Sequence, residues 1–399
     1  MKFYISIHLV ILSLFLSISF FNLLTAPRIK LKKNLGNRFP INWLKFLKSK
    51  GRDKNLYIKE SHELDNKLNT KISVLVPARN EDKKISTCLD SILKQNYPNF
   101  EVIVYDDNST DDTFQIMKTY AEKFSFIKVI KGGTLPEGWT GKNWACYNLA
   151  KLASGELLIF MDADVVLKEG VLEFVENEFK TSDIKMLSCF PTQVMKSIGE
   201  YLIVPNMNWI LLTFLPLILV YKAKHSSFVS ANGQFIVFRK EIYTKYNGHY
   251  AVKSEIVEDM ELARLLKRNN EKIKTFLGGD GIFCRMYDDL LSAIKGFSKN
   301  FFNGFKTNYL KFSLLLTFIV AIYLSPFLLV FIEKDYLLIL VFVLIQKILI
   351  SLNSSQNVLY NLVLSPFHFI VILYLGILSM YKSFKREFEW KGRKVFIKS

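Results

Sequence analysis

Two aspartates, Asp162 and Asp164, directly follow the apolar run at residues 157–161. Ionised carboxylates beside a buried strand are costly to desolvate unless they pair with or bind a cation. Hard oxygen ligands at this spacing suit Mg²⁺ or Mn²⁺ held together with substrate phosphates. The pair therefore predicts a site for a divalent metal and a phosphorylated substrate.

Polar clusters also follow two earlier apolar runs. Residues 77–81 (Pro-Ala-Arg-Asn-Glu) come after the run 72–76, and residues 106–111 (Asp-Asp-Asn-Ser-Thr-Asp) come after the run 100–105. Each cluster alone is also typical of a turn or a helix start. The carboxyl ends of parallel strands meet at one edge of an open α/β sheet, where such sheets bind ligands. The succession of clusters therefore favours a binding site.

Short apolar runs alternate with segments of helical periodicity from Lys71 to about Gly281. The strand candidates are residues 72–76, 100–105, 127–130 and 157–161, and the helix candidates are residues 85–95, 111–124 and 143–153. Strands that alternate with helices predict an α/β fold with a mostly parallel sheet and right-handed crossovers.

A nearly uncharged stretch at residues 4–26 is long enough to cross the hydrocarbon core of a membrane. A cleaved signal peptide is the alternative, but the run is longer than a usual signal core and no clear cleavage site follows it. Basic residues cluster from Arg28 to Arg52, so the positive-inside rule predicts that the following domain is cytoplasmic. We therefore expect a membrane anchor at residues 1–27 and a basic juxtamembrane linker at residues 28–70.

The C-terminal part, residues 309–399, contains apolar blocks at residues 310–332, 336–352 and 358–381. Together with the anchor, these blocks predict a multi-pass protein of the plasma membrane. Three crossings from the cytoplasm would place the basic tail outside, against the charge rule. One block is therefore expected to turn back, and the short middle block is the candidate. A transporter is weakly supported, because few ionisable residues interrupt the blocks.

Residues 201–221 are apolar enough to span a bilayer, although segments on both sides belong to the same predicted domain. We expect a helix or hairpin in the membrane interface that contributes to an acceptor entrance. An internal core helix is the alternative.

The composition agrees with a polar domain joined to membrane segments. Half of the 399 residues are hydrophobic, 22% are charged, and the net charge is +17. Basic residues that set topology explain this charge best, and attraction to anionic lipids comes second. Nucleic acid is not expected as a partner, because no stripe of basic and aromatic residues recurs. The four cysteines form no C-x-x-C pair and suit a reducing compartment.

The motifs together resemble those of the family 2 glycosyltransferases, which have the GT-A fold and invert the anomeric centre. The resemblance covers roughly residues 71–300 and implies a catalytic domain at residues 71–308. Within the family, the chain is most similar to membrane enzymes of carotenoid (diaponeurosporenoate-type) and hopanoid pathways. The family motifs are Val-Pro-Ala-Arg-Asn-Glu at 76–81, Asp-Asp-Asn-Ser-Thr-Asp-Asp-Thr at 106–113, Asp-Ala-Asp at 162–164 and Val-Glu-Asp at 257–259. The segments similar to the carotenoid enzymes are residues 141–145, 283–287 and 389–393.

The resemblance assigns roles to individual residues. Asp164 corresponds to the metal ligand of the family, and Asp162 to its neighbour near the metal, the ribose and the diphosphate. Asp259 corresponds to the general base, and an acid in the first turn of helix 260–267 is the alternative. Lys142 and Arg285 are candidate cations for the diphosphate, with a surface charge as the alternative. The nucleoside pocket comprises Pro77, Ala78, Asn80 and Glu81, together with Asp107 for the uracil ring.

The resemblance implies a glycosyltransferase (hexosyltransferase) that uses a UDP-sugar, a divalent metal (Mg²⁺ or Mn²⁺) and a membrane lipid acceptor such as a carotenoid or another isoprenoid. No Q-x-x-R-W motif is present at residues 281–287, which favours a single, non-processive transfer. An ionised carboxylate acceptor needs no base, so the presence of Asp259 favours a hydroxyl acceptor. The alternatives are transfer to a polyprenyl phosphate or a diacylglycerol, and an inactive nucleotide-binding scaffold at the membrane.

Overall fold

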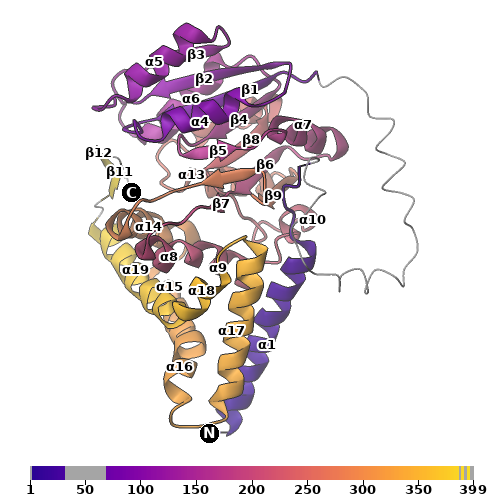
Figure 1. Cartoon of the computed structure of the whole chain (residues 1–399), viewed down its shortest axis with the longest axis vertical. Helices are drawn as coiled ribbons and strands as arrows, with labels where there is room; N and C mark the ends of the chain where they lie inside the picture. Colours follow the sequence, from indigo (N-terminus) through magenta and orange to yellow (C-terminus); the bar gives the residue numbers. More distant parts are fainter. Residues whose placement is uncertain (1, 32–68, 386–387, 391–392, 396–399) are drawn as a thin grey trace, which may run out of the picture.

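The computed structural model describes residues 2–31, 69–385, 388–390 and 393–395, so most of the predicted linker at residues 28–70 lies outside the described residues. Figure 1 shows an α/β domain that sits on a bundle of long helices. The N-terminus lies at the far tip of the bundle, and the C-terminus lies beside the α/β domain.

A seven-stranded sheet with the strand order β3-β2-β1-β4-β8-β6-β9 forms the centre of the α/β domain. Strands β3, β2, β1 and β4 are parallel to one another. Strand β8 runs antiparallel to β4 and β6, while β6 and β9 are parallel. The predicted α/β fold with a mostly parallel sheet is therefore confirmed. The strands are β1 Ile72–Ala78, β2 Phe100–Asp106, β3 Ile127–Lys131, β4 Leu157–Met161, β6 Met186–Phe190, β8 Phe235–Arg239 and β9 Ile273–Leu277.

The crossover helices explain why the central strands read as continuous apolar runs. Helices on both faces bury a parallel sheet, and β1 is buried along its whole length. Helix α4 turns Ile85, Leu89 and Ile92 toward the sheet at helical spacing. The other helices of the domain are α5 Thr113–Lys123, α6 Gly141–Leu152, α7 Val171–Thr181, α11 Lys240–Lys245, α12 Gly248–Ala251 and α13 Glu258–Arg268, and α4 itself is Ile85–Leu93.

A smaller sheet lies next to the carboxyl end of β4. It has the order β5-β10-β7, with β5 Val165–Leu167, β10 Ile282–Cys284 and β7 Thr192–Gln193. Because β5 starts directly after Asp164, the loop at residues 162–164 is held between the two sheets. This arrangement positions the Asp-Ala-Asp segment.

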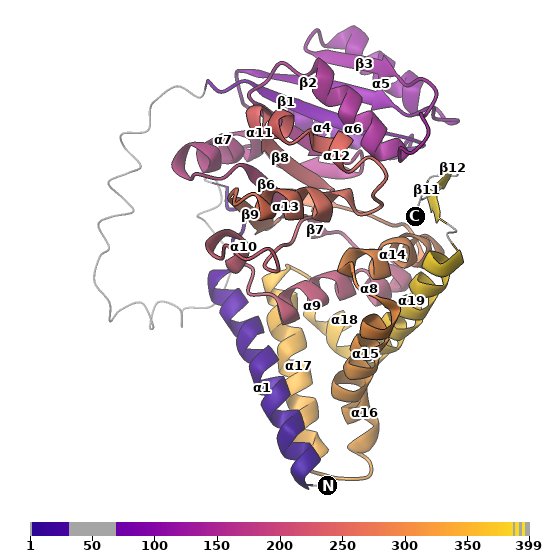
Figure 2. The same cartoon turned by 180° about the vertical axis from the view of Figure 1, so that it is seen from behind.

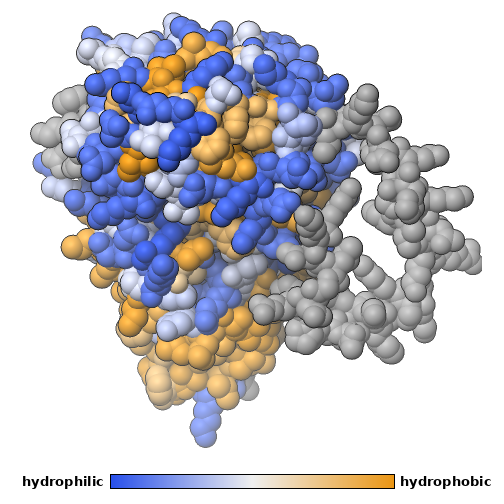
Figure 3. Space-filling model, turned by 45° about the horizontal axis from the view of Figure 1, so that its top comes forward, coloured by the Kyte–Doolittle hydropathy of each residue, from blue (hydrophilic) through white to orange (hydrophobic). Residues whose placement is uncertain are grey.

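The bundle contains four helical stretches that are long and apolar enough to cross a membrane. Large apolar side chains such as Leu14, Leu314 and Phe331 are exposed on it, and Figure 3 shows an apolar surface around this half of the molecule. These features indicate membrane association. The stretches are α1 Lys2–Thr25, α17 Tyr336–Asn353, α19 Ser365–Lys385 and a composite of α15 Tyr309–Ile319, the π-helical turn η2 Val320–Leu324 and α16 Ser325–Leu329.

The middle apolar block runs the height of the bundle, and the last block is the one that turns back within it. Helix α17, which is the middle block, runs beside α1 over the height of the bundle (Figures 1 and 2). Helices α18 (Val358–Val363) and α19 stay nearer the α/β domain, and α19 packs against α14 (Leu290–Phe305). The expectation that residues 336–352 turn back therefore does not match this arrangement. A hairpin of strands β11 (Phe388–Trp390) and β12 (Arg393–Val395) follows α19.

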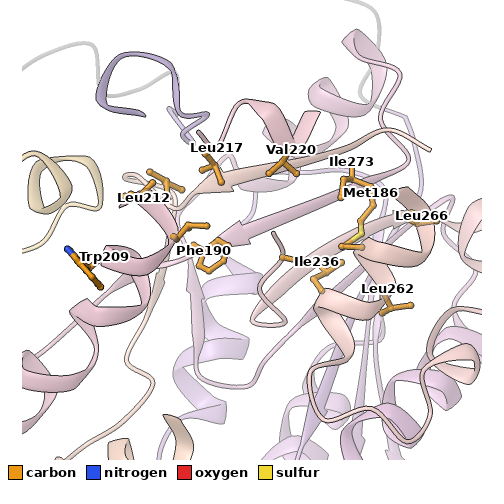
Figure 4. Packing of buried hydrophobic residues seen from close by; sticks show 14 of the residues in the cluster. Met186, Phe190, Trp209, Leu212, Leu217, Val220, Ile236, Leu262, Leu266 and Ile273 are labelled. Atoms are coloured by element: carbon orange, nitrogen blue, oxygen red, sulfur yellow. The ribbon is translucent and has the colours of Figure 1, made fainter. Parts of the chain in front are cut away.

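Residues 201–221 form short helices between the bundle and the sheet, and no single long helix. They are parts of α8 (Ile198–Ile203), α9 (Pro205–Phe214) and α10 (Leu219–Lys222). Trp209 and Leu212 of α9 are buried in the same apolar cluster as sheet residues such as Met186 and Ile236 (Figure 4). The apolar character of this segment therefore reflects packing between the two halves of the molecule.

Side-chain and backbone hydrogen bonds fasten α1 to both α9 and the sheet. The Asn22 amide donates to the carbonyls of Leu212 (3.0 Å) and Leu215 (2.8 Å), and its Oδ1 accepts from the Leu217 amide (2.7 Å). These bonds satisfy backbone groups at the end of α9, which would otherwise lack partners. Just after α1, the Ile29 amide donates to the Leu277 carbonyl of β9 (3.0 Å). The first residues of the predicted linker thus belong to the edge of the sheet.

Candidate functional site

A cavity of about 1800 Å³ lies between the α/β domain and the bundle. Residues from two of the sheet-edge clusters, from the start of α6 and from the start of α13 line it, although they are far apart in the sequence. The predicted site residues in its lining are Pro77, Glu81, Lys142, Asp162, Asp164 and Asp259. The structure therefore brings together the residues expected for the metal, the diphosphate and the base.

Asp164 belongs to the cavity lining, and one of its carboxylate oxygens has no hydrogen-bond partner among the described residues. This oxygen, Oδ1, is buried. Burial, together with the negative charges of Asp162 and Glu81, raises the pKa of Asp164 to about 7. A cation at this position would remove the repulsion between these carboxylates.

The donor set fits a divalent cation that shares its coordination with a substrate. Among the described residues, no group of three or more histidine, cysteine, aspartate or glutamate side chains could hold an ion. Asp162 and Asp164 would therefore act as a pair of protein ligands, with phosphate oxygens and water as the others. Mg²⁺ is commonly bound in this way.

Lys142 connects the aspartate pair to the start of α13. Its Nζ lies 2.8 Å from Asp162 Oδ1 and 3.1 Å from Glu258 Oε1, and it donates to the Gly233 carbonyl (3.2 Å). Burial alone would lower the pKa of Lys142, but Asp162 and Glu258 outweigh burial and hold it well above its ordinary value. The side chain projects from the first turn of α6, where Thr140 caps the helix. Lys142 is therefore a fixed positive charge in the cavity.

Asp259 is held by two backbone amides at the start of α13. Its Oδ2 accepts from the Gly233 amide (2.6 Å), and its Oδ1 accepts from the Met260 amide (2.7 Å). Burial, and next the charge of Glu258, raise the pKa of Asp259 to about 7. A carboxylate with this pKa can accept a proton near neutral pH. Asp259 thus lies in the first turn of α13, as one interpretation expected, and also lines the cavity, as the role of general base requires.

A glycine allows these charged groups to come so close. A Cβ atom at Gly233 would lie 2.9 Å from Lys142 Nζ and 3.0 Å from Glu258 Oε1. Any larger residue would push the lysine and the glutamate away from their present positions.

Three of the predicted nucleoside-site residues form hydrogen bonds between the loop after β1 and the loop after β2. The Asn80 amide donates to Ser109 Oγ (3.0 Å), and Asn80 Oδ1 accepts from the Thr110 amide (2.8 Å). The Asp107 amide donates to the Ala78 carbonyl (2.8 Å). Ala78, Asn80 and Asp107 therefore tie the loop after β1 to the loop after β2, and none of them is part of the cavity lining.

Arg285 has carboxylate partners and lies outside the cavity lining. Its Nε lies 2.9 Å from Glu200 Oε1, and its Nη1 lies 3.4 Å from Asp288 Oδ1. Glu200 also closes the capping box of α8 with Ser197. Arg285 therefore fastens α8 to the loop after β10.

Several lysines that were not predicted as site residues line the cavity: Lys84, Lys295, Lys299, Lys306, Lys382 and Lys385. Lys84 Nζ donates to the carbonyls of Arg285 (3.1 Å) and Met286 (3.3 Å), and its charge opposes the raised pKa of Asp164. Lys299 comes from α14, beyond the four motifs. The amphipathic pattern of α14 predicts that one face of this helix is buried. The local sequence does not indicate that the helix lines this cavity.

Helices on the bundle side supply most of the apolar lining of the cavity, although α14 and α19 also contribute Lys295, Lys299, Lys382 and Lys385. This part of the wall is formed by α9, α14 and α19, and α9 belongs to the segment predicted to contribute to an acceptor entrance. The apolar lining residues from these helices include Met207, Ile210, Phe214, Phe301, Phe305 and Leu375. The cavity thus has a charged end, around Asp162, and an apolar end, around Phe301.

Comparison with known proteins gives one family and a set of curated relatives. Residues 73–246 match the family model described as Glycosyl transferase family 2. A 4,4'-diaponeurosporenoate glycosyltransferase from Staphylococcus haemolyticus (strain JCSC1435) is 31% identical over 57% of this chain and 60% of its own length. A protein of the same name from Staphylococcus aureus (strain USA300) is 27% identical over 58% of this chain and 61% of its own length. The match thus spans about three-fifths of these relatives.

Among solved structures, a mannosyltransferase from Pyrobaculum calidifontis in complex with GDP-Man and Mn²⁺ is 16% identical. The match covers 79% of this chain and 87% of that chain, with a TM-score of 0.48. The family match, together with the sheet order, confirms the predicted GT-A fold.

Proposed function

We propose that the chain transfers one sugar from a UDP-sugar to a hydroxyl group of a membrane lipid, and the match of residues 73–246 to the Glycosyl transferase family 2 model supports this proposal. The acceptor class is a carotenoid or another isoprenoid. The reaction inverts the anomeric centre and ends after a single transfer.

One observation carries this proposal: a single cavity joins the charged end around Asp162 and Lys142 to the apolar end around Phe214 and Phe301. A nucleotide diphosphate needs positive charge and polar partners, and the charged end supplies them. A lipid needs an apolar surface, and the apolar end adjoins the membrane-length helices. Both substrates therefore have a suitable surface in the same cavity.

At the charged end, Asp162 and Asp164 would hold a divalent cation together with the phosphates of the donor. When bound, this cation would stabilise the negative charge on the departing diphosphate. Lys142 keeps Asp162 in place through their ion pair and adds a second positive charge. Its partner Glu258 restrains Lys142 from the other side.

Asp259 acts as the general base in this mechanism. As the acceptor oxygen bonds to the anomeric carbon, the bond from that carbon to the diphosphate breaks and its electron pair leaves with UDP. The proton of the acceptor hydroxyl passes to the Asp259 carboxylate. Backbone amides of Gly233 and Met260 fix the orientation of that carboxylate, so little reorganisation is needed.

The name of the curated relatives supports a carotenoid acceptor, but the acceptor that it names carries a carboxylate where we propose a hydroxyl group. Diaponeurosporenoate denotes a carboxylate, which is already ionised near neutral pH. Such an acceptor needs no base. A buried carboxylate with a pKa of about 7, as in Asp259, is useful for a hydroxyl acceptor, which has to lose a proton.

For the membrane topology, we propose a protein of the plasma membrane with its catalytic domain in the cytoplasm. The chain crosses through α1, α15–α16 and α17, and α18–α19 turns back toward the catalytic domain. This arrangement places Lys382 and Lys385 on the same side as Arg28 and Lys30, as the positive-inside rule requires.

Product analysis tests the proposed reaction. The full chain in neutral detergent is incubated with radiolabelled UDP-glucose or UDP-GlcNAc, Mn²⁺ and extracted membrane lipids, and the lipids are then separated. We expect a labelled lipid whose formation is lost in Asp164→Ala and kept in Asp183→Ala, a control at an exposed aspartate paired with Lys272. Nucleotide binding without any labelled lipid or free sugar would instead support a scaffold.

A further inference from the structure

Lys299 is a cation inside the cavity that no described residue neutralises by contact. Its side chain lines the cavity from α14. Within the described part of the chain, its Nζ forms neither a hydrogen bond nor an ion pair. Lys142 and Lys84 have partners, namely Asp162 and Glu258 for Lys142 and two backbone carbonyls for Lys84. Lys295, one turn earlier on α14, also lines the cavity but is more exposed than Lys299.

Close packing of α14 keeps Lys299 in this position. A Cβ atom at Gly296 would lie 2.0 Å from the Tyr287 hydroxyl, so the helix rests directly on that side chain. At the start of α14, Leu290 lies against Gly199 of α8, where a Cβ atom would come within 2.7 Å of it. These contacts hold α14 against Tyr287 and α8, so the helix keeps Lys299 at the cavity.

The surroundings of Lys299 disfavour a free charge. Burial lowers the pKa of Lys299, and the charges of Glu258, Asp162 and Asp259 act in the opposite direction without touching it. Lys142 adds repulsion. Lys299 is half-buried, and an anion that arrives with a substrate would give its ammonium group a charged partner inside the cavity.

We propose that Lys299 binds an anionic oxygen, of a phosphate or a carboxylate, that a substrate brings into the cavity. This proposal rests on the proposed function, because it treats the cavity as the place where donor and acceptor meet. The anion has two possible sources, the diphosphate of the donor and an acidic group on the lipid acceptor. Phe301 and Phe305 line the cavity from the same helix, so an amphiphile with an acidic head would contact both kinds of surface.

Binding measurements without turnover test the proposal. Isothermal titration calorimetry of the full chain in neutral detergent uses two probes, UDP with Mn²⁺ and dodecyl phosphate, with dodecanol as the uncharged control. For Lys299→Met, we expect a Kd increase of about tenfold or more for at least one anionic probe, as loss of a charged hydrogen bond implies. Lys299→Arg keeps the charge and should restore most of the affinity. Lys118→Met, an exposed lysine of α5, should bind like the wild type.

The pattern of losses identifies the source of the anion. Weaker binding of UDP alone assigns Lys299 to the donor diphosphate, whereas weaker binding of dodecyl phosphate alone assigns it to the acceptor. Equal affinities of Lys299→Met and the wild type for both probes would overturn the proposal, provided that both proteins have the same Tm. A wild type that binds the probes but makes no glycolipid would refute the proposed function and leave the anion site standing.

Discussion

Two regions of the molecule bury a lysine, and they use it differently. At the sheet edge, Lys142 contacts the carboxylates of Asp162 and Glu258. In the bundle, Lys347 lies 3.2 Å from His368 Nδ1 and over the rings of Trp209 and Phe369, and no described carboxylate pairs with it. The sheet edge therefore concentrates opposite charges where chemistry is proposed, while the bundle uses its lysine among aromatic rings to hold helices together.

A second contrast concerns two individual side chains, one from each region. In the bundle, the side-chain nitrogen and oxygen of Asn22 both form hydrogen bonds with the backbone around α9. At the sheet edge, Asp164 Oδ1 has no hydrogen-bond partner among the described residues. A fully bonded polar group stabilises one packing arrangement. An unbonded buried carboxylate oxygen weakens the free protein and is ready for a ligand.

The largest expected effect tests whether the sheet edge is the catalytic region. Asp259→Asn removes the proton acceptor but keeps the shape of the side chain. We expect kcat for lipid glycosylation to fall about 10³-fold, while the Kd for UDP stays within about twofold. Steady-state kinetics and calorimetry measure the two quantities. Full kcat in this variant would mean that the acceptor is already ionised or that another group is the base.

The second effect compares the two lysines directly. Lys142→Met leaves Asp162 and Glu258 without their partner. Because these ion pairs are partly exposed to solvent, we expect a loss of about 2 kcal/mol of unfolding free energy. Lys347→Met removes a charge that has no opposite partner among the described residues, so we expect a change within about 1 kcal/mol, or a gain. Thermal and denaturant unfolding in detergent measure both variants. Equal losses would break the distinction between the regions.

The third effect tests whether the bundle positions α9. Asn22→Ala leaves the Leu212 and Leu215 carbonyls and the Leu217 amide unsatisfied, at a cost of about 2 kcal/mol. Because α9 lines the apolar end of the cavity, transfer to lipid should fall more than hydrolysis of the UDP-sugar by water. A matched control is Ser17→Ala on the exposed side of α1. Proportional loss of both activities would show that Asn22 affects stability alone.

The smallest effect concerns pH. The base has to be ionised, and burial raises the pKa of Asp259 to about 7, so kcat/KM should rise with pH up to about 7 and then level off. Below that value the rate should fall about tenfold per pH unit. Glu258→Gln removes a charge that raises this pKa, so the midpoint should move to lower pH. An unchanged midpoint in this variant would contradict the electrostatic account of Asp259.

Sequence patterns predicted the four parallel strands, the sheet edge with Asp162 and Asp164, and the membrane-length helices. These signals are local: a buried strand reads as a short apolar run, and its carboxyl end is marked by the polar residues that follow. The same reasoning placed Asp259 at the start of a helix. It did not show that Asp259 and Lys142 share Gly233 as a hydrogen-bonding partner.

Tertiary structure alone decided how distant segments meet. The antiparallel strand β8, the partnership of Arg285 with Glu200, the course of α17 beside α1 and the entry of Lys299 into the cavity depend on contacts between residues far apart in the sequence. Local propensity carries no information about such contacts, because their free energy arises only when the two surfaces pack together. The sequence was therefore enough to predict candidate site residues such as Asp162 and Asp259, while the residues that contact them could be identified only from the tertiary structure.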